Sequence, residues 1–265
     1  MPSSVFEWSA GSLRPETPGL PADSRAAAYT TLRTYGGRRV LRLAMHLDRL
    51  VGSVAALGRP GSLELGTLRA ALGAAVARAG FAESRLRVTF APPRLLLAIE
   101  PFTSLAPELY RDGVACVTSR LRRERPAAKD TRFQAVAERA RAELPSGVHE
   151  ALLVSDDGAI LEGLSSNFFA VGDGTLFTEG PRVLPGVTRA IVLELARARL
   201  PVREQAVPCS RLALLSEGFL TSVSRGILPV ASIDGRRLGD GRPGRVAAVL
   251  RDDFEALVER EAEPL

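Results

Sequence analysis

The fold of this chain is decided by the stretch EGLSSNFF at residues 162–169, together with LPGVTR at residues 184–189. Glu162 follows the apolar residues of a predicted strand, where its carboxylate either faces a bound group or lies in water at a hairpin end. Gly186 precedes a predicted helix, whose first N–H groups form a site for an anion. Taken alone, an ordinary turn into an amphipathic helix explains LPGVTR equally well.

Strands and helices surround these stretches on both sides. Asp156-Asp157-Gly158 and Gly172-Asp173-Gly174 have the composition of hairpin turns, and apolar residues at helical spacing predict helices. In helix 132–144 we expect the apolar residues, Val136 included, to face the core. The predicted strands cover residues 114–118, 151–154, 160–161, 168–171, 175–178, 219–223 and 228–233, and the predicted helices cover residues 132–144, 188–200 and 245–260.

The N-terminal part has its own set of elements. After a Pro/Ser/Gly-rich start, strands are predicted over residues 28–35, 39–43, 86–90 and 95–99, helices over residues 46–57 and 65–79, and a connector over residues 101–113. The pattern favours a two-domain α/β protein. We expect a small N-terminal α/β domain with the connector over residues 1–107, and a larger C-terminal α/β domain over residues 108–265.

Lys129, in the larger domain, is the only lysine among 35 Lys and Arg residues. Lysine can lose its proton and act as an amine nucleophile, whereas a guanidinium stays charged. Lys129 is therefore a candidate Schiff-base lysine, the alternative being a chance exception on a solvated surface. A lysine that binds an aldehyde cofactor needs an anion site for the phosphate, an acid at the pyridine nitrogen and a shielded pocket.

Two further segments are candidates for the phosphate. Arg49 lies on the side of its predicted helix where Gly52 and Ser53 leave room, although an exposed surface arginine is the commoner case. The segment Thr221–Gly226 is a hydroxyl-rich strand end followed by glycine, a pattern that is common in loops.

Composition excludes several classes of protein. Apolar content of 46% and charged content of 25% are typical of a globular chain. The net charge of +5 comes from scattered arginines with only 5% aromatic residues, which argues against nucleic-acid binding. The two cysteines lack the spacing of a metal site or a disulfide. Neither a signal peptide nor a membrane span is predicted, so we expect a cytoplasmic protein without a metal.

Together, these residues resemble the motif of the class IV pyridoxal-phosphate enzymes, which include branched-chain and D-amino-acid aminotransferases and 4-amino-4-deoxychorismate lyase. The resemblance extends over residues 29–234. The only lysine and the only asparagine, Asn167, both fall on motif positions. The matching segments are residues 46–50, Ser53, Lys129, residues 162–169, Thr178, residues 184–189, 219–221 and 229–230.

The resemblance implies fold type IV, with a pseudo-barrel in the larger domain, pyridoxal 5'-phosphate held between the domains, and a homodimer. It implies that Lys129 forms the Schiff base and that Glu162 partners the pyridine nitrogen. The implied cofactor site also includes Asn167, and Tyr29 and Thr31 border the substrate. The residues implied to hold the phosphate are Arg49, Val187 and Thr188 through their N–H groups, and the loop at Val223 and Ser224.

Three positions depart from the family pattern. Gln134 stands where branched-chain members have a tyrosine beside the cofactor's phenolic oxygen, and Val223 stands where many members have threonine. Ala26-Ala27-Ala28 replaces the usual Tyr-Gly-Asp-Gly-like segment before the first strand. These departures concern mainly the substrate end of the site.

The same residues serve both transamination and elimination, so the sequence leaves two reactions open. The chain length, the segment YTTLR at residues 29–33, and Ser224-Arg225-Gly226 before Pro229 resemble the lyases. We therefore expect a 4-amino-4-deoxychorismate lyase of folate biosynthesis, forming 4-aminobenzoate and pyruvate. The alternative is a D-amino-acid or branched-chain transaminase with a small amino substrate. A non-catalytic binding protein or an RNA-binding module is disfavoured, because the only lysine is kept at the Schiff-base position.

Overall fold

The computed structural model describes residues 4–16, 27–59 and 61–265. Its contacts define two compact units, each described here by itself. Unit 1 consists of Met1–Thr103, Ala127–Gln134 and Leu257–Leu265, and unit 2 consists of Ser104–Pro126 and Ala135–Ala256. Of the departing segment Ala26-Ala27-Ala28, Ala26 lies outside the described residues, as does part of the N-terminal start.

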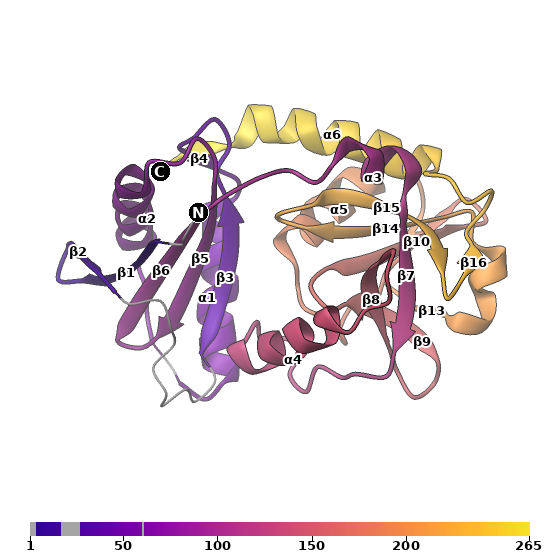
Figure 1. Ribbon diagram of the computed structural model, residues 1–265, viewed down its shortest axis with the longest axis horizontal. Coiled ribbons are helices and arrows are strands. Elements are labelled where there is room, and N and C mark those ends of the chain that lie inside the picture. The colour runs from indigo at the N-terminus through magenta and orange to yellow at the C-terminus, as the bar shows by residue number, and fades with distance from the viewer. Residues whose placement is uncertain (1–3, 17–26, 60) are drawn as a thin grey trace. The chain divides into compact units, whose positions relative to one another are not determined.

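Unit 1 contains a five-stranded antiparallel sheet in the order β2-β1-β6-β5-β3. Its strands are β1 (Ser4–Ser9), β2 (Ser12–Pro15), β3 (Ala28–Arg33), β5 (Ser84–Ala91) and β6 (Arg94–Pro101). The helices α1 (Leu43–Ala56) and α2 (Leu65–Ala79) pack on this sheet (Figure 1). A short ladder joins β4 (Arg39–Val40) to β17 (Glu263–Pro264).

The core of unit 1 follows from the alternation of side chains along its strands. In β3 the residues Ala28, Thr30 and Leu32 are buried, while those between them are only partly buried. The buried side packs with α1 and α2 in one apolar cluster that includes Leu50 and Leu72. Consequently the other side of β3, which carries Tyr29 and Thr31, faces away from this core.

Unit 2 is built on a ring of six strands. The order β10-β14-β15-β7-β8-β9 closes because β9 also pairs with β10, at Glu162 and Asn167. The ring strands are β7 (Val114–Ser119), β8 (Val148–Val154), β9 (Ala159–Gly163), β10 (Asn167–Gly172), β14 (Glu217–Ser222) and β15 (Gly226–Ile233). This closed ring is the pseudo-barrel that the resemblance implies, and the predicted fold class is confirmed.

Short strands and helices extend this ring. They are α3 (Pro107–Asp112), β11 (Thr175–Phe177), α5 (Val187–Arg197), β12 (Val202–Arg203), β13 (Val207–Pro208), the 3-10 helix Cys209–Leu214 and β16 (Arg236–Arg237). Two long helices, α4 (Thr131–Ala142) and α6 (Arg245–Glu261), each begin in one unit and end in the other. Helix α5 packs on β14, which places its N-terminus in unit 2.

Several local features differ from the sequence predictions. The start of the chain contains the hairpin β1–β2, whose turn residues Ala10 and Gly11 both have positive φ. The predicted connector contains α3, which begins at a proline. Val136, predicted to face inward, is 40% exposed. The division at residue 107 remains a prediction, but residues 127–134, with Lys129, pack in unit 1.

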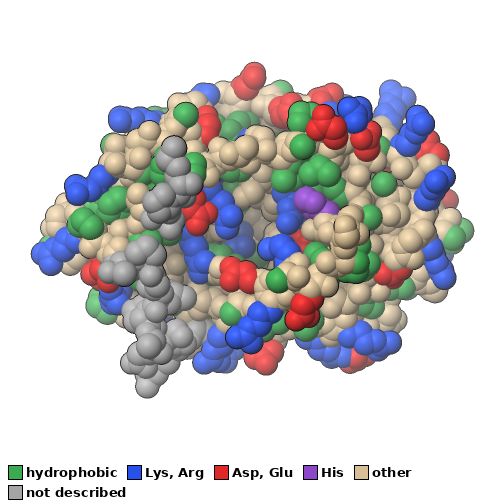
Figure 2. All heavy atoms as spheres, viewed as in Figure 1, with side chains coloured by type: hydrophobic (Ala, Val, Ile, Leu, Met, Phe, Trp, Pro, Cys, Tyr) green, Lys and Arg blue, Asp and Glu red, His purple; other side chains and the backbone are tan. Residues whose placement is uncertain are grey.

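Three further observations concern surface charge, membrane-spanning helices and metal-binding groups. Basic and acidic side chains are interspersed over the face shown in Figure 2. Within residues 4–16, 27–59 and 61–265, no helix has both the length and the apolar character to cross a membrane. In that same part of the chain, no group of His, Cys, Asp and Glu side chains is arranged to hold a metal ion.

Candidate active site

Lys129 lies beside the outer side of β3 in unit 1. Its carbonyl accepts a hydrogen bond of 2.9 Å from the Tyr29 N–H, and its Nζ lies 4.9 Å from the centroid of the Tyr29 ring. The guanidinium of Arg87 lies 4.4 Å from the same ring, and Thr31 is paired with Arg87 across β3 and β5. The structure thus brings the predicted amine against Tyr29, and Thr31 follows two residues later on the same side of β3.

Arg49 lies behind this group, on α1, and it is partly buried rather than a freely solvated surface residue. Its terminal nitrogen donates to Thr30 Oγ1 at 2.6 Å. Thr30 Oγ1 also lies 2.9 Å from Nδ1 of the buried His46. Burial, together with the positive charges of Arg49 and Lys129, lowers the pKa of His46 well below its ordinary value. His46 is therefore a neutral imidazole at physiological pH.

Glu162 is buried at the end of β9 in unit 2 and is surrounded by donors. Arg123 Nε donates to its carboxylate at 2.8 Å, the Leu184 N–H at 3.2 Å and Asn167 Nδ2 at 3.4 Å. The side chains of Glu162 and Arg123 are 3% and 7% exposed, respectively. A guanidinium and two amide N–H groups thus converge on one carboxylate, which fixes its position in the protein.

Asn167 connects Glu162 to the start of α5. Its Nδ2 also donates to the Leu184 carbonyl at 2.9 Å. A Cβ at Gly186 would lie 2.2 Å from Asn167 Oδ1, so only glycine fits there. No side chain caps α5 at Gly186, and its first turn, with buried Val187 and Thr188, contains no acidic residue. The first N–H groups of α5 therefore have no partner within the helix, as an anion site requires.

The loop predicted at Val223 and Ser224 forms the turn between β14 and β15. Just before it, Thr221 is paired with Asn167 across β14 and β10. The Thr221 hydroxyl is buried and has no hydrogen-bond partner within the described part of the chain. Because a buried hydroxyl without a partner is costly, we expect a water molecule or a polar ligand to bind there.

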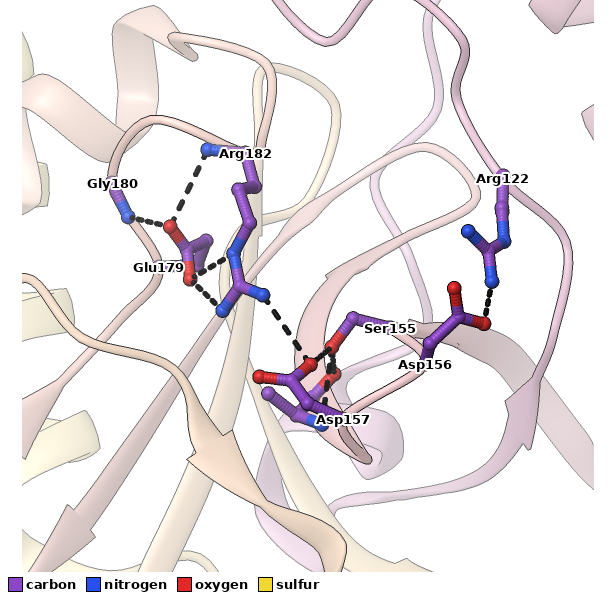
Figure 3. A network of polar contacts seen from close by, with 8 residues as sticks. Arg122, Ser155, Asp156, Asp157, Glu179, Gly180 and Arg182 are labelled. Atoms are coloured by element: carbon purple, nitrogen blue, oxygen red, sulfur yellow. Dashed lines mark hydrogen bonds and ion pairs between the residues drawn. The ribbon is translucent and has the colours of Figure 1, made fainter.

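The loop that leads into α5 is fixed by charged side chains (Figure 3). Glu179 accepts hydrogen bonds from the Gly180 and Arg182 N–H groups and from the Arg182 guanidinium. Burial alone would raise the pKa of Glu179, but these bonds outweigh it and hold the pKa below its ordinary value. In addition, Arg189 donates to the Glu179 carbonyl at 2.7 Å. This network thus connects the loop at residues 179–182 to α5 through Arg189.

A second buried carboxylate holds the turn that contains Ser224. Glu150 is fully buried and accepts a 2.7 Å bond from Arg225, which also donates to Ser165 at 3.1 Å. Burial opposes ionisation of Glu150, but Arg225 and Arg141 outweigh it and lower its pKa. Glu150 thereby ties the β14–β15 turn to the loop that precedes Asn167.

The predicted site residues fall into two groups. Tyr29, Thr31, Arg49 and Lys129 lie in unit 1, and Glu162, Asn167, Val187, Thr188, Val223 and Ser224 lie in unit 2. Sequence reasoning missed Thr30, His46 and Arg123. His46 is one of two histidines in the chain and begins the matching segment at residues 46–50, and these two signals could have drawn attention to it.

Comparison with known proteins identifies the family. The family model of class IV amino-transferases matches residues 27–233. This chain belongs to the class IV aminotransferase family. The Thermotoga maritima protein named "Probable branched-chain-amino-acid aminotransferase" is 32% identical over 88% of this chain and 87% of its own length. The branched-chain-amino-acid aminotransferase of Salmonella typhimurium is 37% identical over 44% of this chain, a match that spans 39% of the relative's length.

Solved structures agree with this assignment. The branched-chain amino acid aminotransferase of Escherichia coli has a TM-score of 0.83 at 25% identity, over 98% of this chain and 96% of its own. A hypothetical aminotransferase from Mycobacterium tuberculosis in its PLP-bound form has a TM-score of 0.77 at 25% identity, over 96% of this chain and 98% of its own. Family membership confirms the predicted pyridoxal-phosphate-dependent enzyme and its cofactor. The named relatives favour the transaminase alternative over the lyase.

The residues present fit pyridoxal phosphate. Unit 1 offers the primary amine of Lys129, and unit 2 offers the buried carboxyl group of Glu162, the type of group that partners a pyridine nitrogen. For a phosphate, unit 1 offers the guanidinium of Arg49, and unit 2 offers the uncapped N-terminus of α5. The buried Thr221 hydroxyl supplies a further polar group that protein atoms leave unpaired.

Proposed function

We propose that this enzyme is an amino-acid transaminase that acts on branched-chain amino acids. The main support is the Thermotoga maritima relative, since its similarity extends over 88% of this chain. The buried, donor-rich surroundings of Glu162 fit the cofactor chemistry that a transaminase shares with the lyase, so they support the enzyme class and not the choice between the two reactions. In this proposal the lyase reaction expected from the sequence becomes the second candidate.

Pyridoxal phosphate, when bound, supplies an aldehyde carbon that exchanges amines and a protonated ring that withdraws electrons from the substrate Cα. We assign Lys129 as the residue that binds it covalently. As a free amine, Lys129 Nζ would act as the general base that takes the proton from the substrate Cα and later gives it back. Arginine could not do this, because its guanidinium does not lose a proton.

The other residues bind and orient. Glu162 would hold the cofactor's ring nitrogen, and Arg123 fixes its carboxylate from the protein side. Asn167 fixes the direction of that carboxylate through its bond to the Leu184 carbonyl. The phosphate is assigned to Arg49, to the N–H groups of Val187 and Thr188, and to the turn at Val223 and Ser224.

Single-substrate half-reactions test the proposal. The holoenzyme is incubated with L-leucine, D-alanine or 4-amino-4-deoxychorismate, and its visible absorbance is followed. Conversion to the pyridoxamine form with L-leucine, lost in Lys129→Ala and in the charge-preserving Lys129→Arg, is the expected result. No conversion with L-leucine, together with formation of 4-aminobenzoate, would overturn it in favour of the lyase.

One observation favours the lyase as the second candidate. Gln134 occupies the position at which branched-chain members have tyrosine. If Gln134→Tyr reacts faster with L-leucine than the wild type and forms less 4-aminobenzoate, the result supports the lyase as the activity of the wild-type enzyme. The homodimer implied by the resemblance remains a prediction, and light scattering of the purified enzyme tests it.

A further inference from the structure

Three polar side chains of α1 form a row in unit 1. His46, Arg49 and Ser53 follow the i, i+3, i+7 spacing that places side chains on one side of a helix. This side faces Thr30, which is fully buried on the inner side of β3. Thr30 thus lies on the opposite side of β3 from Tyr29 and Thr31, so it does not border the substrate.

The Thr30 hydroxyl has two partners, and its single proton can go to only one of them. Arg49 has donors only, so Thr30 Oγ1 accepts from it at 2.6 Å. The remaining partner is His46 Nδ1 at 2.9 Å. If Nδ1 carried a proton, the buried Thr30 proton would have no acceptor among residues 4–16, 27–59 and 61–265, which is costly. Thr30 therefore donates to Nδ1, and His46 carries its proton on Nε2.

The main chain of Arg49 is also tied to Lys129. Ser53 Oγ donates to the Arg49 carbonyl at 2.7 Å and accepts from the Lys129 N–H at 3.1 Å. Ser53 itself is fully buried. The side chain of Arg49 is thus directed by Thr30, and its backbone position is linked through Ser53 to the amine-bearing residue.

We propose that Thr30, with His46 behind it, is a positioning residue that directs the Arg49 guanidinium for phosphate binding. The inference rests on the proposed role of Arg49 in holding the cofactor phosphate. A guanidinium fixed before binding loses less side-chain freedom when an anion arrives, so affinity rises without a new contact. Pyridoxal, which lacks the phosphate, should gain nothing from this arrangement.

Binding titrations of the apoenzyme separate positioning from folding. Thr30→Val keeps the shape of the side chain and removes the hydroxyl, and Thr30→Ser keeps the hydroxyl. We expect Thr30→Val to raise the Kd for pyridoxal phosphate about tenfold, with the Kd for pyridoxal unchanged. Thr30→Ser should match the wild type for both ligands. Equal weakening of both ligands by Thr30→Val, or no weakening of either, would overturn the proposal.

Two further measurements keep the outcomes distinct. If Arg49→Gln fails to weaken pyridoxal phosphate selectively, the assignment of Arg49 to the phosphate is wrong. A selective effect of Arg49→Gln without one of Thr30→Val refutes only the positioning role. If Thr30→Val does not fold, the ¹⁵N NMR spectrum of the wild-type apoenzyme still tests the proposal, because it shows which ring nitrogen of His46 carries the proton. A His46 protonated on Nε2 supports the proposal and one protonated on Nδ1 contradicts it, and the only other histidine is His149.

Discussion

Replacing Arg123 by methionine removes the guanidinium that lies 2.8 Å from the Glu162 carboxylate. Both side chains are more than nine-tenths buried, so water cannot take the place of the lost charge. Breaking a buried ion pair from one side costs about 3–5 kcal/mol. With an unfolding entropy of about 2.1 cal/mol/K per residue over 265 residues, this lowers the Tm by about 5–9 °C.

The assay is equilibrium unfolding of the apoenzyme in urea and by heat. Arg122→Met is a matched control, because the neighbouring Arg122 pairs with Asp156 in solvent (Figure 3) and both side chains are more than half exposed. Such a surface pair contributes about 0–1 kcal/mol. The double variant Arg123→Met with Glu162→Gln removes both charges and should recover part of the loss. The reasoning is refuted if Arg123→Met is no less stable than Arg122→Met.

Three other perturbations have definite outcomes. Gly186→Ala places a Cβ 2.2 Å from Asn167 Oδ1, so we expect a loss of about 1–3 kcal/mol in urea unfolding and weaker pyridoxal phosphate binding; unchanged stability would contradict the packing. The folded-state pKa of His46 is lowered, so below pH about 6.5 the unfolded chain binds more protons than the folded chain. The free energy of unfolding therefore decreases as the pH is lowered, by up to about 1.4 kcal/mol per pH unit. His46→Gln should reduce this slope, and an unaltered slope would show that another group causes it. Glu150→Gln leaves the mostly buried Arg225 without its carboxylate, and a loss of about 3–5 kcal/mol is expected in the same unfolding assay; a loss below about 1 kcal/mol would mean that solvent reaches Arg225.

Local patterns in the sequence predicted most of the fold. Helix α2 has the predicted bounds Leu65–Ala79, and the hairpins at residues 156–158 and 172–174 form as their turn residues require. The β1–β2 hairpin was missed because its turn begins with Ala10, which rarely adopts positive φ. Helix α3 had a usable signal, since it begins at Pro107 and is followed by Gly113.

Contacts between residues that lie far apart in the sequence could not be predicted from local sequence patterns. The position of Lys129 in unit 1 depends on its backbone bond with Tyr29, a residue far away in the sequence. The bond between Arg123 and Glu162 likewise depends on how β9 is placed, and the run of arginines at residues 122–125 contains nothing that distinguishes Arg123. Val136 fits the helical spacing of an apolar stripe, but it is exposed, since spacing alone does not determine how wide the covered side of a helix is.

The most direct test of the account is chemical identification of the residue that binds the cofactor. The enzyme loaded with pyridoxal phosphate is reduced with borohydride, digested and mapped by mass spectrometry. Lys129 is the only lysine in the chain, so the account predicts the cofactor on the peptide that contains it, and no labelled peptide from Lys129→Arg. An active enzyme in which the Lys129 peptide stays unlabelled would contradict it.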